Sequence, residues 1–179
     1  GNIEAVADIY SPYTSLTMPA SDVQLTPVYK DPESINAIAD AYVRGGDHAD
    51  ANYGSEPTIE IKSWSEDLTE QREGFIKFDL SSIPETISSA KLNIQVNTNT
   101  GGTRHSCFFV EDDSWTETGI TYNNKPSAGI SLETKGVPIS GNWIEFDVTN
   151  HVKAELQGDR FKFLTNLRTC LFYMSRKKD

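Results

Sequence analysis

Residues that form reactive sites are scarce in this sequence. It has two cysteines and three histidines among 179 residues, and it contains no GxSxG, no glycine-rich loop ending in Gly-Lys-Ser/Thr, no HExxH and no paired CxxC. These patterns position a serine nucleophile, a nucleotide phosphate or a zinc ion. Their absence speaks against the common serine hydrolases, phosphate-loop proteins and standard zinc enzymes.

The few cysteines and histidines leave their roles open. Cys107 and Cys170 either form a disulfide or are two buried small apolar side chains, and the sequence alone does not decide between these interpretations. His48, His105 and His151 each fall in or beside an expected loop or strand end. For His48 and His105 we expect a solvated surface position.

Long apolar runs are also missing, since nothing approaches the roughly 18 apolar residues of a membrane span. Acidic residues outnumber basic ones by 26 to 16, which gives a net charge of -10. We therefore expect neither a nucleic acid nor a membrane as a partner. A local basic site is compatible with this charge, because salt confines each charge to roughly 10 Å. Without a signal peptide or a Met at position 1, we expect the chain to be part of a longer parent.

Short alternating segments dominate what is present. Period-2 alternation of apolar and polar residues, bounded by turn residues, predicts half-buried antiparallel strands. We expect strands at residues 41–44, 58–64, 74–80, 89–97, 106–111, 143–149, 161–165 and 170–174, with one short helix at 148–156. Long helices between strands are absent. The fold class is therefore all-β, an antiparallel β-sandwich or jelly roll.

The domain organisation follows from where this pattern begins. Residues 1–36 lack sustained periodicity and are interpreted as a leader or linker, possibly from a neighbouring domain. Within it, 23–29 can form an edge strand and 31–37 one helical turn. Residues 37–179 are then one β-sandwich module.

Two of the alternating segments predict an outward basic surface. In 74–80 the pattern points Phe75 and Lys77 outward, and in 58–64 it points Lys62 and Trp64 outward. Arg72 enters the same sheet from the connecting loop. Such a cluster can bind sugar carboxylates, because arginine offers a bidentate fork and lysine a point charge.

One feature limits that interpretation, and one adds to it. Glu60 and Asp79 lie on the same faces and can simply pair with the bases. For each of Trp64, Trp115 and Trp143 we expect structural packing, and Trp64 is the best candidate for stacking on a sugar ring, because its strand already has an apolar face.

The acidic cluster Asp112, Asp113 and Glu117 has three possible interpretations. Neighbouring carboxylates most often cap turns, they can hold a structural calcium ion, and a pair of them can serve a glycosidase. The spacing matches no strict calcium loop, so a calcium site rests on composition alone.

Several motifs in order resemble a known family. They are Ala39-Asp40-Ala41-Tyr42-Val43-Arg44-Gly45-Gly46, Asn52-Tyr53-Gly54, Ile76-Lys77-Phe78-Asp79-Leu80-Ser81, Ser89-Ala90-Lys91-Leu92, Asp113-Ser114-Trp115-Thr116-Glu117 and Ile120-Thr121-Tyr122-Asn123-Asn124-Lys125-Pro126. Together, from about residue 39 to 176, they resemble the disaggregatase-related (DNRLRE) domains, and among these the group classed as carbohydrate-binding module family 96.

That resemblance has specific implications. Such modules are antiparallel β-sandwiches appended to secreted polysaccharide-degrading enzymes, and members of family 96 accompany alginate lyases and bind alginate. The resemblance implies a basic, strand-borne face supplied by Lys62, Arg72 and Lys77, with Arg44 as a further candidate. It gives the motif residues a structural role, with Trp115 and Glu117 locking a loop against the sandwich.

The leading hypothesis is a secreted, non-catalytic module that binds an anionic polysaccharide, alginate or another polyuronate, and targets a tethered lyase. An alternative is a structural or adhesive domain of a cell-surface protein, which would bind no soluble sugar. A third is a lyase, for which His105, Tyr122 and Arg104 supply candidate groups without any fixed geometry. Affinity for soluble alginate separates the first from the second, and turnover of alginate would favour the third.

Overall fold

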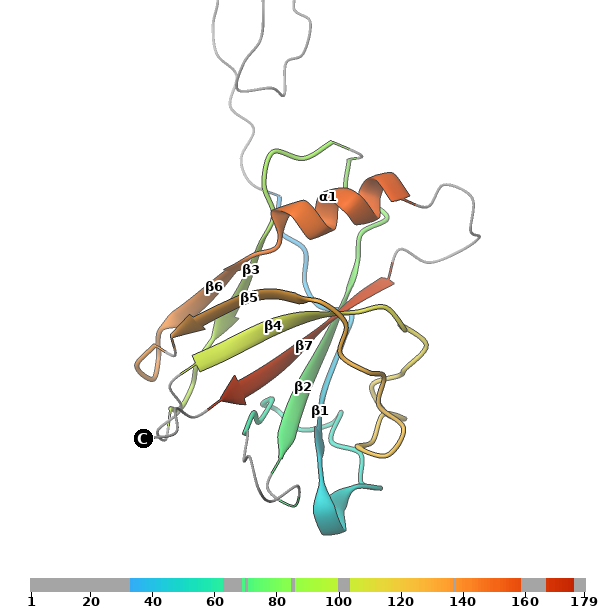
Figure 1. Cartoon of the computed structure of the whole chain (residues 1–179), viewed down its shortest axis with the longest axis vertical. Helices are drawn as coiled ribbons and strands as arrows, with labels where there is room; N and C mark the ends of the chain where they lie inside the picture. The colour runs from blue at the N-terminus through green and yellow to red at the C-terminus, as the bar shows by residue number, and fades with distance from the viewer. Residues whose placement is uncertain are drawn as a thin grey trace, which may run out of the picture.

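The computed structural model describes residues 33–62, 69, 71–84, 86–99, 104–136, 138–158 and 167–175, with the backbone alone for 158 and 167–175. These residues form two antiparallel sheets and one short α-helix (Figure 1). The prediction of an all-β, antiparallel fold is confirmed. No described helix is long and apolar enough to cross a bilayer.

The larger sheet has the order β1-β2-β7-β4-β5. Its strands are β1 (Ala39–Arg44), β2 (Arg72–Asp79), β7 (Leu167–Ser175), β4 (Arg104–Val110) and β5 (Ser131–Gly136). The smaller sheet pairs β3 (Lys91–Gln95) with β6 (Trp143–Asp147). The last strand of the chain, β7, therefore lies in the middle of the larger sheet, between β2 and β4.

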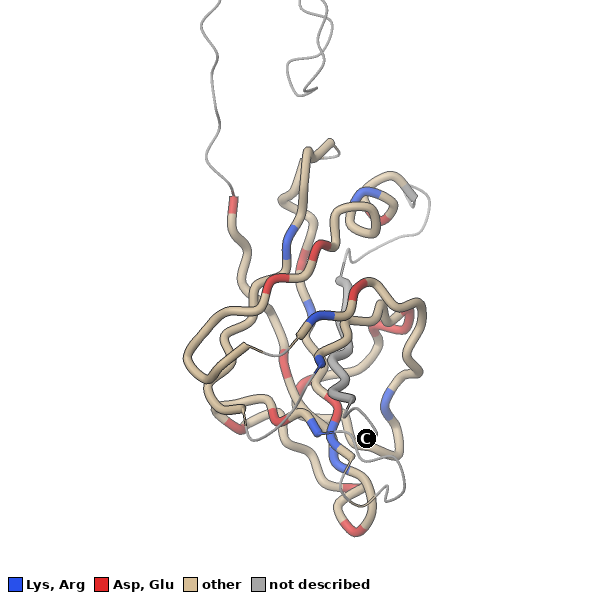
Figure 2. The backbone as a smooth tube through the Cα atoms, turned by 60° about the vertical axis from the view of Figure 1, so that its left-hand side comes forward, with Lys and Arg blue, Asp and Glu red and all other residues tan. Residues whose placement is uncertain are grey.

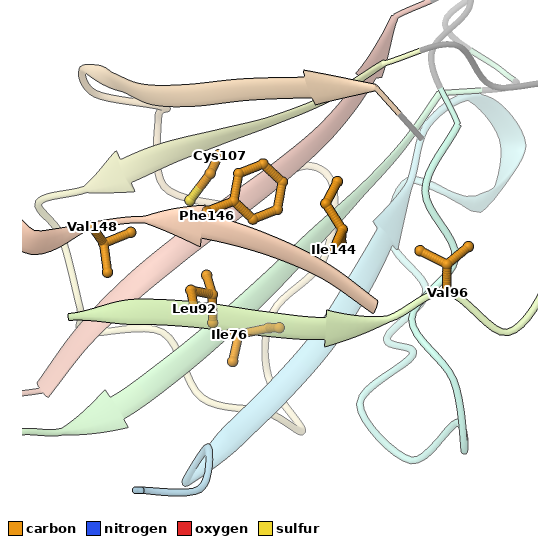
Figure 3. Packing of buried hydrophobic residues seen from close by; sticks show 7 residues of the cluster. All are labelled: Ile76, Leu92, Val96, Cys107, Ile144, Phe146 and Val148. Atoms are coloured by element: carbon orange, nitrogen blue, oxygen red, sulfur yellow. The ribbon is translucent and has the colours of Figure 1, made fainter. Parts of the chain in front are cut away.

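The first core lies between the two sheets. Its buried members come from β2, β3, β4, β6 and the residues directly after β3 and β6, and they point into the space between the ribbons (Figure 3): Ile76, Leu92, Val96, Cys107, Ile144, Phe146 and Val148. The alternation predicted for 89–97 and 143–149 is confirmed here. Cys107 is completely buried in this core, and the side chain of Cys170 lies outside the described residues.

A second core lies on the opposite face of the larger sheet. Residues 111–130, which connect β4 to β5, fold over that face and bury Trp115 and Ile120 against Phe75 and Val43. The larger sheet is therefore covered on both faces, by β3 and β6 on one side and by this connection on the other. We call residues 111–130 the covering loop.

The covering loop overturns one prediction. Phe75 and Lys77 were expected to point to solvent, but their exposed fractions are 0% and 6%. Alternation correctly identifies which residues share a face of a strand. The face assigned to solvent is exposed only when no other segment covers it. Here a loop of mostly polar sequence supplies the second cover, so both faces of β2 are buried.

Other segments differ from expectation as well. Of the expected strand 58–64, residues 58–61 form no ladder, and Lys62 makes a single antiparallel bridge with Arg72. Ile59 and Ile61 nevertheless pack against the first core. Residues 33–37 are not helical, and β5 was not predicted. The expected strands at 23–29 and 161–165, and Trp64, lie outside the described residues.

One helix, α1 (Thr149–Gly158), follows β6 close to the position predicted for it. Its first residue is fixed by side-chain hydrogen bonds: the Thr149 amide donates to Asp147 Oδ1 at 2.9 Å, and Thr149 Oγ1 accepts from the Ala90 amide at 2.9 Å. The ring of His151 lies 4.0 Å from that of Phe109, which attaches the helix to β4.

His105 contradicts its expected surface position. It is 7% exposed on β4, opposite Lys135, and its Nε2 makes no hydrogen bond within the described residues. Burial lowers the pKa of His105, because the charged imidazolium loses its hydration. The folded chain therefore holds this histidine neutral at a pH where the unfolded chain protonates it.

This predicts a specific acid sensitivity. Below about pH 6.5 the unfolded state binds a proton that the folded state does not, so stability falls as the pH falls, by at most about 1.4 kcal/mol per pH unit. Urea unfolding at about pH 8 and pH 5 measures the loss, and His105→Gln should reduce it. An unchanged pH dependence in the variant would show that other groups cause it.

Candidate functional site

Three cationic residues lie side by side at one end of the larger sheet. Arg44 is the register partner of Arg72 across β1 and β2, and Lys62 bridges Arg72 from the other side. Residues directly opposite in antiparallel pairing project from the same face. Arg44, Arg72 and Lys62 therefore form one row, which we call the cationic row. Figure 2 shows that basic and acidic residues are interspersed over the described part of the molecule.

The cationic row is half-buried, and an acidic residue lies against it. Glu60 Oε2 lies 2.9 Å from Arg72 Nη1, and the exposed fractions of these side chains are 50% and 22%. The pairing of Glu60 with a base, expected from the sequence as an alternative, is confirmed for Arg72. An anion that approaches the row meets a guanidinium already oriented by Glu60.

An aromatic pair adjoins the row. Tyr42 precedes Arg44 by two residues on β1, and its ring stacks on that of Tyr53 with centroids 4.5 Å apart. Burial raises the pKa of Tyr42, and the carboxylates of Glu60 and Glu56 add to the effect. Sequence reasoning did not select these tyrosines, although both belong to the motifs that carry the family resemblance. Their contact links residues from separate segments, which no local pattern reveals.

Lys77 does not join the row. It projects from the other face of β2, and its Nζ donates to the carbonyls of Asp113 and Trp115 at 2.6 Å each. The ammonium also lies 4.6 Å from the centroid of the Trp115 ring. Burial lowers the pKa of Lys77, with opposing contributions from Asp113 and Asp112. Its geometry is that of a structural cation beneath the covering loop.

Polar side chains hold the covering loop at several further points. Asn52 Nδ2 donates to the carbonyls of Glu117 and Ile120 at 2.8 and 2.7 Å, and Glu117 Oε2 accepts from the Asp40 amide at 3.3 Å. A side chain at Gly54 would collide with the Glu117 carbonyl, so this close approach requires glycine. The predicted structural role of Trp115 and Glu117 is confirmed.

The second half of the loop is held by a buried charge. Glu73, on β2, accepts from Lys125 Nζ at 2.7 Å and from Gln71 Nε2 at 2.8 Å. Tyr122 donates its hydroxyl to Gln71 Oε1 at 3.0 Å, and the Lys125 ammonium lies 4.8 Å from the Tyr122 ring centroid. The motif residues 120–126 thus serve to attach the loop.

The acidic turn does not gather its carboxylates. Asp112 Oδ1 caps its own turn by accepting from the Ser114 amide at 2.9 Å, while Glu117 turns toward Asp40. Among the described residues, no group of three or more His, Cys, Asp or Glu side chains is placed to hold a metal ion. A structural calcium ion stays a prediction of the sequence.

Residues 31–166 match the model of carbohydrate-binding module family 96. The chain belongs to carbohydrate-binding module family 96. The match extends from β1 to α1, ends before β7, and includes the cationic row, the aromatic pair and the covering loop. No curated protein matches the chain.

Membership makes the coarse function of the module clear. A family of carbohydrate-binding modules consists of binding domains, so the activity to be explained is recognition of a carbohydrate. Of the six residues that the sequence suggested for the site, the structure brings Arg44, Arg72 and Lys62 together, while Phe75 and Lys77 are buried on the opposite face of β2 and Trp64 lies outside the described residues.

Proposed function

We propose that this module binds an anionic polysaccharide, alginate in particular, through the cationic row, and that it holds an appended lyase on this substrate outside the cell. The observation that carries the proposal is the register that aligns Arg44, Arg72 and Lys62 across neighbouring chain segments. Uronate polymers carry one carboxylate per sugar, and a row of bases offers one cation per strand.

The spacing supports this pairing. Neighbouring strands lie about 4.8 Å apart, which is close to the length of one pyranose along a polysaccharide chain. A polyuronate that crosses β1, β2 and the Lys62 segment can therefore present successive carboxylates to successive bases. Arginine binds a carboxylate with two parallel hydrogen bonds, so Arg44 and Arg72 favour a planar anion over a neutral hydroxyl.

The proposal predicts selective and salt-dependent binding. Affinity electrophoresis or calorimetry with alginate, pectin, hyaluronan and neutral glucans should show binding to alginate and none to the neutral glucans. Because the ligand is held through charge, the affinity for alginate should fall by about 5- to 30-fold between roughly 50 and 200 mM NaCl.

Two outcomes would contradict the proposal. Equal affinity for alginate and a neutral glucan, without salt dependence, would remove the charged recognition. No affinity for any soluble polysaccharide would favour the adhesive-domain alternative. Micromolar affinity is sufficient, because a tethered module acts by raising the local concentration of the enzyme on its substrate.

A further inference from the structure

The outer face of the smaller sheet exposes a tryptophan. Trp143, the first residue of β6, is 62% exposed, although the apolar residues that alternate with it, Ile144 and Phe146, are buried at 4% and 0%. Its side chain therefore lies on the face of β6 directed away from the core shown in Figure 3. A large aromatic side chain at this exposure leaves most of its surface in contact with water.

The immediate neighbours of Trp143 suit a sugar. Gln95 lies directly opposite on β3, and the next pair on the same face is Asn93 with Glu145. The negative charge of Glu145 is balanced by Lys91, whose Nζ lies 2.5 Å from Glu145 Oε1. The part of the face next to Trp143 therefore offers one aromatic ring and two side-chain amides, without an uncompensated charge.

The backbone beneath this ring is fixed. The Val96 amide donates to the Asn142 carbonyl at 2.9 Å, and the Gly141 amide donates to the Val96 carbonyl at 2.6 Å, so the ladder between β3 and β6 continues to the turn before Trp143. Gly141 has a φ of 87°, which allows that turn. A rigid support reduces the entropy lost when a ligand orders the indole ring.

We propose that Trp143 is a stacking platform for a pyranose ring, with Gln95 and Asn93 donating or accepting hydrogen bonds to its hydroxyls. This inference rests on the proposed carbohydrate-binding function and adds a second subsite to it. The apolar face of a pyranose matches the flat π-face of an indole, and amides beside it suit the surrounding hydroxyls. Stacking depends on the apolar face of the sugar ring and not on the carboxylate of a uronate.

The two subsites belong to different sheets. Trp143 begins β6, which lies beside β5, whereas the cationic row belongs to β1, β2 and the Lys62 segment at the opposite edge of the larger sheet (Figure 1). A site that recognises the sugar ring itself therefore adds to charged recognition without sharing its residues.

Calorimetry and fluorescence titration with oligoalginate test the platform. Trp143→Ala should weaken binding about 3- to 10-fold, and the loss should be as large at high salt as at low salt, because stacking is not screened. Trp143→Phe should keep most of the affinity but lose the ligand-induced change in tryptophan emission. Ile139→Ala is the matched control, since Ile139 is 79% exposed near the same turn, and it should bind like the wild type.

The outcomes separate this inference from the proposed function. Wild-type affinity and an unchanged emission response in Trp143→Ala would overturn the platform and leave the cationic row intact. Binding of a neutral glucan that depends on Trp143 would support the platform and contradict charged recognition. A wild-type module that binds no polysaccharide would overturn both.

Discussion

Lys77→Met should destabilise the module by about 2–4 kcal/mol. The substitution keeps an unbranched apolar stem of four atoms but removes the ammonium that both the Asp113 and the Trp115 carbonyls accept from, beneath the covering loop. Each buried acceptor left without a donor costs about 1–3 kcal/mol, and the contact of the ammonium with Trp115 is lost as well. Relief from burying a charge offsets part of this cost. Urea unfolding measures the difference.

A matched variant and a local readout make this prediction specific. Lys135→Met removes a lysine that is 36% exposed and paired with Glu133, and it should change stability by less than about 1 kcal/mol. In Lys77→Met, limited proteolysis should cut within residues 111–130 sooner than in the wild type, because the loop loses its central attachment. A variant as stable and as resistant as the wild type would show that Lys77 is not required to hold the loop.

Arg44→Ala combined with Arg72→Ala should lower the affinity for alginate by about 10- to 100-fold. A 10- to 100-fold loss corresponds to about 1.4–2.7 kcal/mol for the two residues together. This is less than about 1.5–3 kcal/mol for each hydrogen bond to a charged group, because both guanidinium groups are partly exposed and Arg72 already pairs with Glu60. The salt dependence of binding should decrease in the same variant, because fewer cations remain to neutralise the ligand. The alginate affinity of Arg72→Lys should lie between those of the wild type and the double variant. Lysine keeps the positive charge but cannot form the two parallel hydrogen bonds of a guanidinium.

Binding must be separated from folding in these variants. Arg72 also holds Glu60, so thermal unfolding of the double variant should be measured alongside its affinity. Lys153→Ala, on α1 and distant from the row, is the control for loss of a positive charge elsewhere and should bind alginate like the wild type. If the double variant keeps wild-type affinity and salt dependence while folded, the polysaccharide binds elsewhere.

Alternation in the sequence was sufficient where each strand has one buried and one exposed face. The predicted inward residues of β3 and β6 all belong to the first core, and Trp143 is exposed on the opposite face. The period of two in side-chain direction is a local property of extended backbone, so it can be identified without knowledge of neighbouring strands. The short helix after β6 was predicted from another local signal, a segment of about two turns that ends at Gly158.

Alternation was insufficient for β2. Phe75 and Lys77 lie on the face that the pattern assigned to solvent, and both are buried because residues 111–130 cover them. That loop has no periodicity that would identify it as a cover. It is held by contacts such as Lys77 with Trp115 and Asn52 with Glu117, which join residues 38 and 65 positions apart in the sequence.

The sequence by itself determined the strand-rich character of this protein and which faces of β3 and β6 are buried. It also contained a set of ordered motifs sufficient to indicate a carbohydrate-binding family. These depend on local backbone geometry and on residue identity. Only the tertiary structure decided which bases meet. Arg44, Arg72 and Lys62 are neighbours because strand register aligns them, while Lys77 is held inside because a distant loop closes over it. Register and loop closure are set by contacts between remote segments.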